Sequence, residues 1–257
     1  MLHGYTAPFT PAGTAALVRP PPWHYCGWLL NVDFACDPDR AAAFVPAALG
    51  RATGRATIHF ADWQATTDGS ELLDPITSQY RETIVILELT RPDGTAAGFC
   101  PLIYVDQDVS MVRGLLQGWP KKLGSTWLTR CLPLDHPAAA PLRAGTRLGA
   151  SLAVKDRRLV EARLQLTGNP GRPLGFAARP TLGTVGWPDL TRPGEPPALR
   201  HLRPLVSGRV GGQWHEATAE LAFLPAPHEE LESLGLRGAT DASVGWLGIT
   251  IDGAAAV

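Results

Sequence analysis

The sequence has no excess charge of either sign and no long hydrophobic run. Its 257 residues contain 23 Lys and Arg against 24 Asp and Glu, and no basic block that would form a nucleic-acid-binding face. The longest apolar run, residues 41–49, is interrupted by Pro46 and is shorter than the roughly 18 residues of a membrane span. Residues 1–5 lack the basic and apolar regions of a signal peptide. We therefore expect a soluble, cytoplasmic protein with neither a nucleic-acid nor a membrane partner.

Motifs for metal, nucleotide and serine-nucleophile chemistry are also missing. The four cysteines, Cys26, Cys36, Cys100 and Cys131, are far apart and form no CxxC pair, which favours free thiols over a metal knuckle. The sequence contains no GxSxG, no phosphate loop, and no GxGxxG after a strand. These absences remove the common signatures of hydrolases, kinases and dinucleotide enzymes.

Turn residues and short β-type runs fill the chain, which has 27 Gly, 24 Pro and 45% hydrophobic residues. Hydrophobic patterning predicts short helices over 37–45, 109–117 and 227–234, and it assigns no structure to the Pro- and Gly-rich residues 168–197. It predicts strands over 28–34, 56–63, 80–89, 97–105, 148–154, 159–166, 202–210, 214–223 and 244–251. Many strands with few helices predict a mainly β (β-rich α+β) fold: a large antiparallel sheet in a closed or nearly closed barrel. We expect an irregular N-terminal arm, residues 1–22, followed by a single domain, residues 23–257.

Two adjacent lysines, Lys121 and Lys122, stand among apolar, Gly and Pro residues in the segment 113–124, which contains no acid. One interpretation is a solvated turn with two surface lysines. In the other, burial and the neighbouring ammonium favour a neutral amine. A neutral lysine in a dry pocket forms Schiff bases with ketones, and the iminium then stabilises carbanion character on the adjacent carbon.

The segment 118–124, GWPKKLG, resembles the signature of the acetoacetate decarboxylase family. Further resemblance lies in Tyr80-Arg81-Glu82 and in residues 102–106, 215–223 and 225–234, so that it covers most of residues 25–250. The resemblance implies that Lys121 forms the Schiff base, that Lys122 favours its neutral form, and that Glu82 is a carboxylate of the substrate pocket. Without it, Glu82 is an exposed strand residue.

One departure from the family pattern concerns the arginine that serves the substrate carboxylate in acetoacetate decarboxylases. The corresponding position here is Gly27, and no arginine occurs between Arg19 and Arg40. Arg113 and Gln117, one helical turn apart, instead face the region of the lysine. This arrangement resembles the branch of the superfamily that uses the lysine on pyruvate-like 2-oxo acids for aldol condensation and dehydration. Arg113 then binds a carboxylate and Gln117 orients a carbonyl, hydroxyl or water, unless Arg113 is an ordinary surface residue of the helix.

Aromatic side chains complete the predicted substrate-binding set, namely Tyr80, Trp119 and Trp246. A tryptophan in a strand, such as Trp246, is also compatible with a plain core position.

These residues lead to three functional hypotheses. The first is a Schiff-base lyase acting on a small, pyruvate-like oxo acid by aldol condensation and dehydration in secondary metabolism. The second is an acetoacetate decarboxylase that releases CO2 from a β-keto acid, and the third is a non-catalytic small-molecule-binding barrel. No metal and no organic cofactor is expected, because the lysine is the electron sink, and the resemblance implies a homo-oligomer.

Overall fold

The structure is a computed structural model that describes residues 1–257, and it is dominated by one twelve-stranded sheet. The strands are β1 (Trp23–Cys36), β2 (Arg51–Thr66), β3 (Gln79–Thr90), β4 (Ala96–Val105), β5 (Lys121–Leu123), β6 (Ser125–Leu128), β7 (Arg147–Val154), β8 (Arg157–Pro170), β9 (Thr181–Val185), β10 (Arg200–Gly211), β11 (His215–Phe223) and β12 (Leu236–Ala256). The α-helices are α1 (Pro38–Ala42), α2 (Pro75–Ser78) and α3 (Asp108–Gln117). Short 3-10 turns are η1 (Ala47–Leu49), η2 (Ser70–Leu73), η3 (Pro137–Ala139), η4 (Gly175–Ala177) and η5 (Glu232–Leu234).

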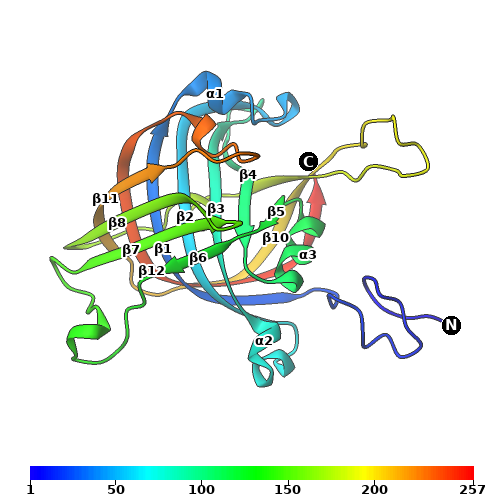
Figure 1. Cartoon of the computed structure of the whole chain (residues 1–257), viewed down its shortest axis with the longest axis horizontal. Coiled ribbons are helices and arrows are strands. Elements are labelled where there is room, and N and C mark those ends of the chain that lie inside the picture. Colours follow the sequence, from blue (N-terminus) through cyan, green and yellow to red (C-terminus); the bar gives the residue numbers. More distant parts are fainter.

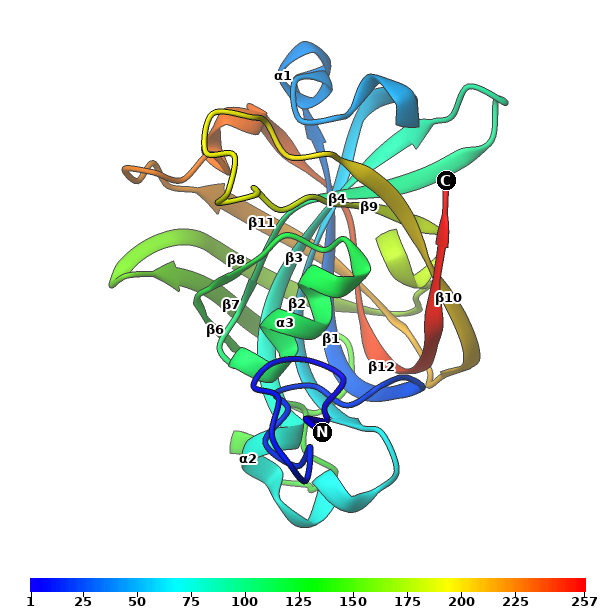
Figure 2. The same cartoon turned by 90° about the vertical axis from the view of Figure 1, so that its right-hand side faces the viewer.

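Part of the sheet closes into a ring. Its strands follow the order β1-β2-β3-β4-β9-β10-β12, and an antiparallel pairing between β1 and β12 completes the circle. Helix α3 lies against β4, β5, β9 and β10 (Figure 2). The predicted closed, mainly β barrel with few short helices is therefore confirmed.

The remaining strands, in the order β11-β8-β7-β6, continue from β12 as a second layer. In Figure 1 this layer crosses in front of β1, β2 and β3. The two layers meet at β6, where the hydroxyls of Thr83 and Thr126 are hydrogen-bonded at 2.7 Å. The largest hydrophobic core lies between them, with Trp28 and Phe60 on the ring side and Leu152 and Leu164 on the other.

Strand alternation builds a second core inside the ring, because successive side chains of a strand point to opposite faces. Val85 and Leu87 of β3 belong to the core between the layers, whereas Ile84 and Ile86 belong to the core inside the ring. Tyr80 has the same parity and lies in the inner core. Glu82, between Tyr80 and Ile84 in this alternation, is buried as well.

Two predicted helices are shorter than expected, and three strands, β5, β6 and β9, were not predicted. The helix at Asp37 has the predicted N-cap but ends at Ala42, because Pro46 has no N–H for the Ala42 carbonyl and its ring would clash with that carbonyl in a longer helix. In 227–234 only η5 forms, since His228 has a left-handed φ of 66°. Residues 168–197, for which no element was predicted, contain β9, which joins β4 to β10 in the ring.

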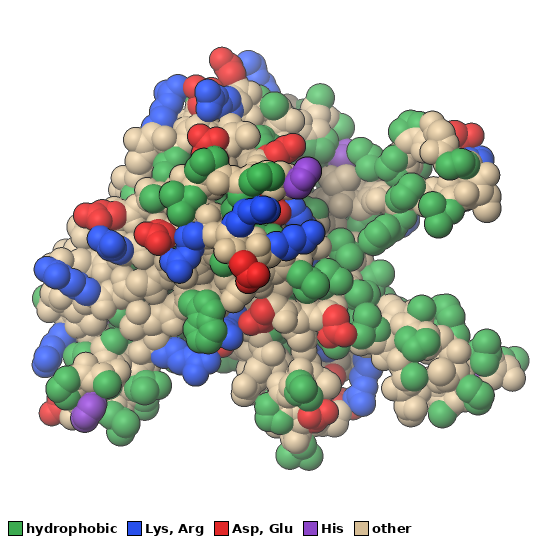
Figure 3. All heavy atoms as spheres, viewed as in Figure 1, with side chains coloured by type: hydrophobic (Ala, Val, Ile, Leu, Met, Phe, Trp, Pro, Cys, Tyr) green, Lys and Arg blue, Asp and Glu red, His purple; other side chains and the backbone are tan.

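Two segments project from the body in Figures 1 and 3: the N-terminal arm, residues 1–22, and the loop 186–199. The arm contains no helix and no named strand. Both carry exposed apolar side chains, among them Phe9 in the arm and Trp187 and Leu190 in the loop. No helix of the structure has both the length and the apolar character needed to cross a bilayer.

Candidate active site

Lys121 points into the ring because β5 pairs in parallel with β4. The register places Lys121 beside Ile103, whose side chain belongs to the inner core. The Lys121 ammonium lies 2.7 Å from Glu82 Oε2 and donates to Ser110 Oγ at 2.9 Å. The side chains of Lys121 and Glu82 are only 8% and 6% exposed. A buried ion pair with a further hydroxyl partner thus forms at residues that are far apart in the chain.

Lys122 points to the opposite side of β5. It pairs with Tyr104, and its ammonium lies 2.6 Å from Glu229 Oε1 while its side chain remains 46% exposed. Tyr104 donates to the other oxygen of Glu229 at 2.9 Å. The two ammonium groups therefore lie on opposite faces of β5, and the expected effect of the Lys122 charge on Lys121 stays a prediction. The reason for the opposite placement is that successive side chains of a strand point to opposite faces of the sheet.

Helix α3 provides the wall against which Lys121 is held. Its buried residues are Ser110, Arg113, Gly114 and Gln117, which share one face at helical spacing. A Cβ on Gly114 would lie 2.4 Å from the Cδ of Lys121, so glycine is required for this close approach. The helix ends at Gly118, whose φ of 87° suits the left-handed cap.

A cavity of about 380 Å³ opens at the lysine. This volume lies in the range of about 300–1,000 Å³ typical of small-molecule sites. Its lining includes Lys121 and Glu82, the predicted residues Tyr80, Gln117 and Trp119, and in addition Tyr25, Trp63, Phe176 and Thr181. Burial raises the pKa of Tyr25 to about 12 and raises that of Tyr80 as well, so both phenols stay protonated at neutral pH.

Arg113 is 3% exposed and does not belong to the cavity lining. Its Nη2 lies 3.7 Å from Glu71 Oε1, and its positive charge acts against the raised pKa of Tyr25. The Gln117 amide donates to the Arg113 carbonyl at 3.0 Å. The structure thus places Gln117 at the cavity and the Arg113 guanidinium outside the lining, whereas a direct carboxylate contact was expected for Arg113.

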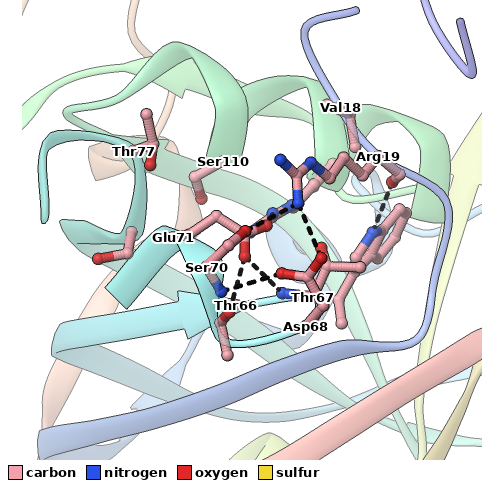
Figure 4. A network of polar contacts seen from close by, with 12 residues as sticks. Val18, Arg19, Thr66, Thr67, Asp68, Ser70, Glu71, Thr77 and Ser110 are labelled. Carbon is pink, nitrogen blue, oxygen red and sulfur yellow. Dashed lines mark hydrogen bonds and ion pairs between the residues drawn. The ribbon is translucent and has the colours of Figure 1, made fainter. Parts of the chain in front are cut away.

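Glu71, the partner of Arg113, is fixed by the network shown in Figure 4. It accepts hydrogen bonds from Thr66 Oγ1 at 2.7 Å and from the Thr67 amide at 3.1 Å. Burial acts to raise the pKa of Glu71, but these hydrogen bonds outweigh it and lower the pKa to about 2. In the same network Arg19 binds Asp68 and Ser70.

Trp246 does not line the cavity, contrary to expectation. Its register partner is Trp28, whose side chain faces the core between the layers, and the two rings lie 5.3 Å apart. Trp246 is 46% exposed on that outer side, whereas Leu247 points into the ring. Alternate residues of β12 face the inside or the outside of the ring, and the sequence alone did not reveal which set faces the cavity.

Several site residues were not identified from the sequence: Ser110, Gly114, Tyr25, Trp63 and Phe176. Ser110 and Gly114 had a usable signal, because they precede Gln117 at helical spacing on the face that already carried Arg113. Phe176 had none, since it comes from the segment without a predicted element. No three His, Cys, Asp or Glu side chains lie close enough together to hold a metal ion.

A family model described as acetoacetate decarboxylase (ADC) matches residues 6–257. The chain belongs to this family.

Solved structures give more detail. The chain is similar to the enduracididine biosynthesis enzyme MppR complexed with the condensation product of pyruvate and imidazole 4-carboxaldehyde, with 30% identity, a TM-score of 0.92, and coverage of 100% of this chain and 97% of that one. An acetoacetate decarboxylase-like enzyme from Sphingomonas wittichii RW1 has 27% identity, a TM-score of 0.88, and coverage of 99% and 98%. Acetoacetate decarboxylase from Legionella pneumophila, at 14% identity, a TM-score of 0.73, and coverage of 93% and 88%, shows the shared fold. No curated protein matched the chain.

Proposed function

We propose that this chain forms a Schiff base between Lys121 and a small 2-oxo acid such as pyruvate, and uses it for aldol condensation and dehydration. One observation carries the proposal: the Lys121 amine borders a cavity and lies 2.7 Å from the buried carboxylate of Glu82. MppR, 30% identical, is complexed with pyruvate in one structure and with a pyruvate condensation product in another, which supports this branch of the family.

The first half of the reaction makes the imine. Glu82 takes a proton from the Lys121 ammonium, and the free amine attacks the ketone carbon while Ser110 holds the nitrogen in place. The carbinolamine hydroxyl receives the proton and leaves as water. The iminium withdraws electrons from the adjacent carbon, and the Glu82 carboxylate removes a proton there to give an enamine.

The second half makes and releases the product. The enamine carbon attacks the carbonyl carbon of an aldehyde, and the resulting alkoxide takes up the proton. Glu82 then removes a second proton from the carbon next to the iminium and returns it to the hydroxyl, which leaves as water, so that a C=C bond forms and gives the unsaturated iminium. Hydrolysis then releases the unsaturated oxo acid and restores Lys121, so each cycle is balanced without an external oxidant or reductant.

In this proposal Gln117 binds the carboxylate end of the oxo acid, and Arg113 favours it electrostatically from outside the lining. Gln117 lines the cavity, and Arg113 acts from behind it as a buried cation whose Nε has no hydrogen-bond partner. Decarboxylation instead requires a carboxylate that leaves, and no arginine occurs among residues 20–39 to serve it.

Borohydride trapping tests the proposal. Incubation with pyruvate and borohydride, followed by intact mass and peptide mapping, should place the adduct on Lys121, and Lys121→Ala should abolish it. Arg113→Ala should weaken trapping of pyruvate severalfold more than trapping of acetone, with Arg147→Ala as an exposed control. An adduct on another lysine, no adduct at all, or rapid CO2 release from acetoacetate would contradict the proposal.

A further inference from the structure

Three arginines, Arg179, Arg203 and Arg209, line the same cavity as Lys121. None of these three arginines belongs to the segments that resemble the family signature. Arg179 is neutralised by Glu88, to which it forms an ion pair. Arg203 and Arg209 are both largely exposed, and neither has a carboxylate within ion-pair distance. They therefore present two uncompensated positive charges at the cavity.

An irregularity of β10 brings Arg209 to this place. Register shifts occur between Leu205 and Val206 and between Ser207 and Val210, and Gly208 between them has a left-handed φ of 53°. Such bulges turn side chains away from the ordinary alternation. The Arg209 guanidinium consequently donates to the backbone carbonyl of Ala177 in η4, which also lines the cavity.

The charge balance of the lining is strongly one-sided. Glu82 is the only acid among the lining residues, and Lys121 neutralises it. The chain as a whole has a net charge of −1, so the positive cavity is a local feature. A concave surface with uncompensated positive charge concentrates anions, and guanidinium groups bind carboxylates in a bidentate manner.

We propose that the second reactant, the aldehyde that joins the oxo acid, carries a carboxylate of its own, which Arg203 and Arg209 bind at the cavity mouth. This inference rests on the proposed function. The cavity of about 380 Å³ has room for both reactants, since a three-carbon oxo acid at Lys121 fills only part of it. The carboxylate of the oxo acid is assigned to the Gln117 end of the cavity, so Arg203 and Arg209 remain for the carboxylate of the aldehyde.

The test compares two aldehydes of similar length, succinic semialdehyde and butanal, each with pyruvate, by the absorbance of the unsaturated product. The wild-type chain should have a kcat/KM at least about tenfold higher for the acidic aldehyde, as expected for charge-assisted contacts. Arg203→Gln and Arg209→Gln should remove most of that preference. Arg200→Gln, in the same strand but outside the lining, is the matched control and should keep it.

Separate readouts distinguish this inference from the proposed function. If pyruvate is trapped on Lys121 but the two aldehydes react equally well, the inference is overturned and the proposed function stands. If the arginine variants lose pyruvate trapping as strongly as they lose the acidic aldehyde, the arginines bind the oxo acid itself, which also overturns it. If no imine forms, the proposed function fails, and the anion site is then tested by titrating the protein with glutarate and following tryptophan fluorescence. Glutarate binding that is lost in the Arg203 and Arg209 variants supports the anion site. No glutarate binding overturns it.

Discussion

Lys121 and Lys122 are adjacent in sequence, yet their ammonium groups lie on opposite faces of β5 and pair with Glu82 and Glu229. Only Lys121 faces the cavity. The two lysines therefore have separable roles: one meets the substrate, and the other joins β5 to Tyr104 through a shared carboxylate.

Replacement of Lys122 tests this separation. Lys122→Gln should change the rate of borohydride trapping with pyruvate by less than about twofold, because a partly exposed ion pair contributes little. The rate is read from intact mass against time, with the exposed Lys155→Gln as control. A large loss of rate in Lys122→Gln alone would show that its charge does act on Lys121.

Glu82→Gln tests the proton acceptor. The amide keeps the size of the side chain but does not take up a proton from Lys121, so imine formation should slow by about 10²–10⁴-fold. Single-turnover trapping measures this, and circular dichroism checks that the fold is retained. Glu161→Gln, at the surface, is the control. An unchanged rate would assign the proton transfer to another group.

Gly114→Ala tests the close approach of α3. The added methyl would lie 2.4 Å from Lys121 Cδ, so the lysine must move away from Ser110 and Glu82. We expect at least about a tenfold loss of trapping, since small misplacements of reacting groups are costly. Gly149→Ala is the matched control, because only one atom, at 3.9 Å, lies within contact of its Cβ. Equal trapping in both variants would contradict the argument.

Glu71 predicts a pH dependence of stability. Its folded pKa of about 2 lies below the ordinary value of 4.5, so its contribution is complete above pH 4.5 and is lost as the pH falls towards 2. Up to about 3 kcal/mol of unfolding free energy is involved. Urea unfolding between pH 6 and 3 should show a smaller decline in Glu71→Gln than in the wild type.

The matched comparison for that experiment is Glu161→Gln, whose carboxylate is exposed and should leave the decline unchanged. Glu71→Gln also leaves Arg113 without its carboxylate, so its stability at neutral pH should fall by about 3 kcal/mol. A wild-type-like decline in Glu71→Gln would show that other groups determine the acid limb.

Much of the fold was predictable because it depends on local pattern. The β-branched run of β3 and its turn to β4 are visible in the sequence, as is the Asp37 N-cap of α1. The site was predictable only in part. The GWPKKLG segment indicated Lys121 and its resemblance indicated Glu82, but neither showed that Ser110 is the third partner.

The sequence by itself determined most of the strands, β5, β6 and β9 excepted, since hydrophobic alternation and turn residues act over a few neighbours. Tertiary structure decided how those strands meet. The parallel register of β4 and β5 gives Lys121 rather than Lys122 to the cavity, and the parity of β12 turns Trp246 outwards. β9, in a segment without local signal, closes the ring because β4 and β10 offer it hydrogen-bond partners. These outcomes depend on backbone pairing between distant residues, which no local pattern encodes.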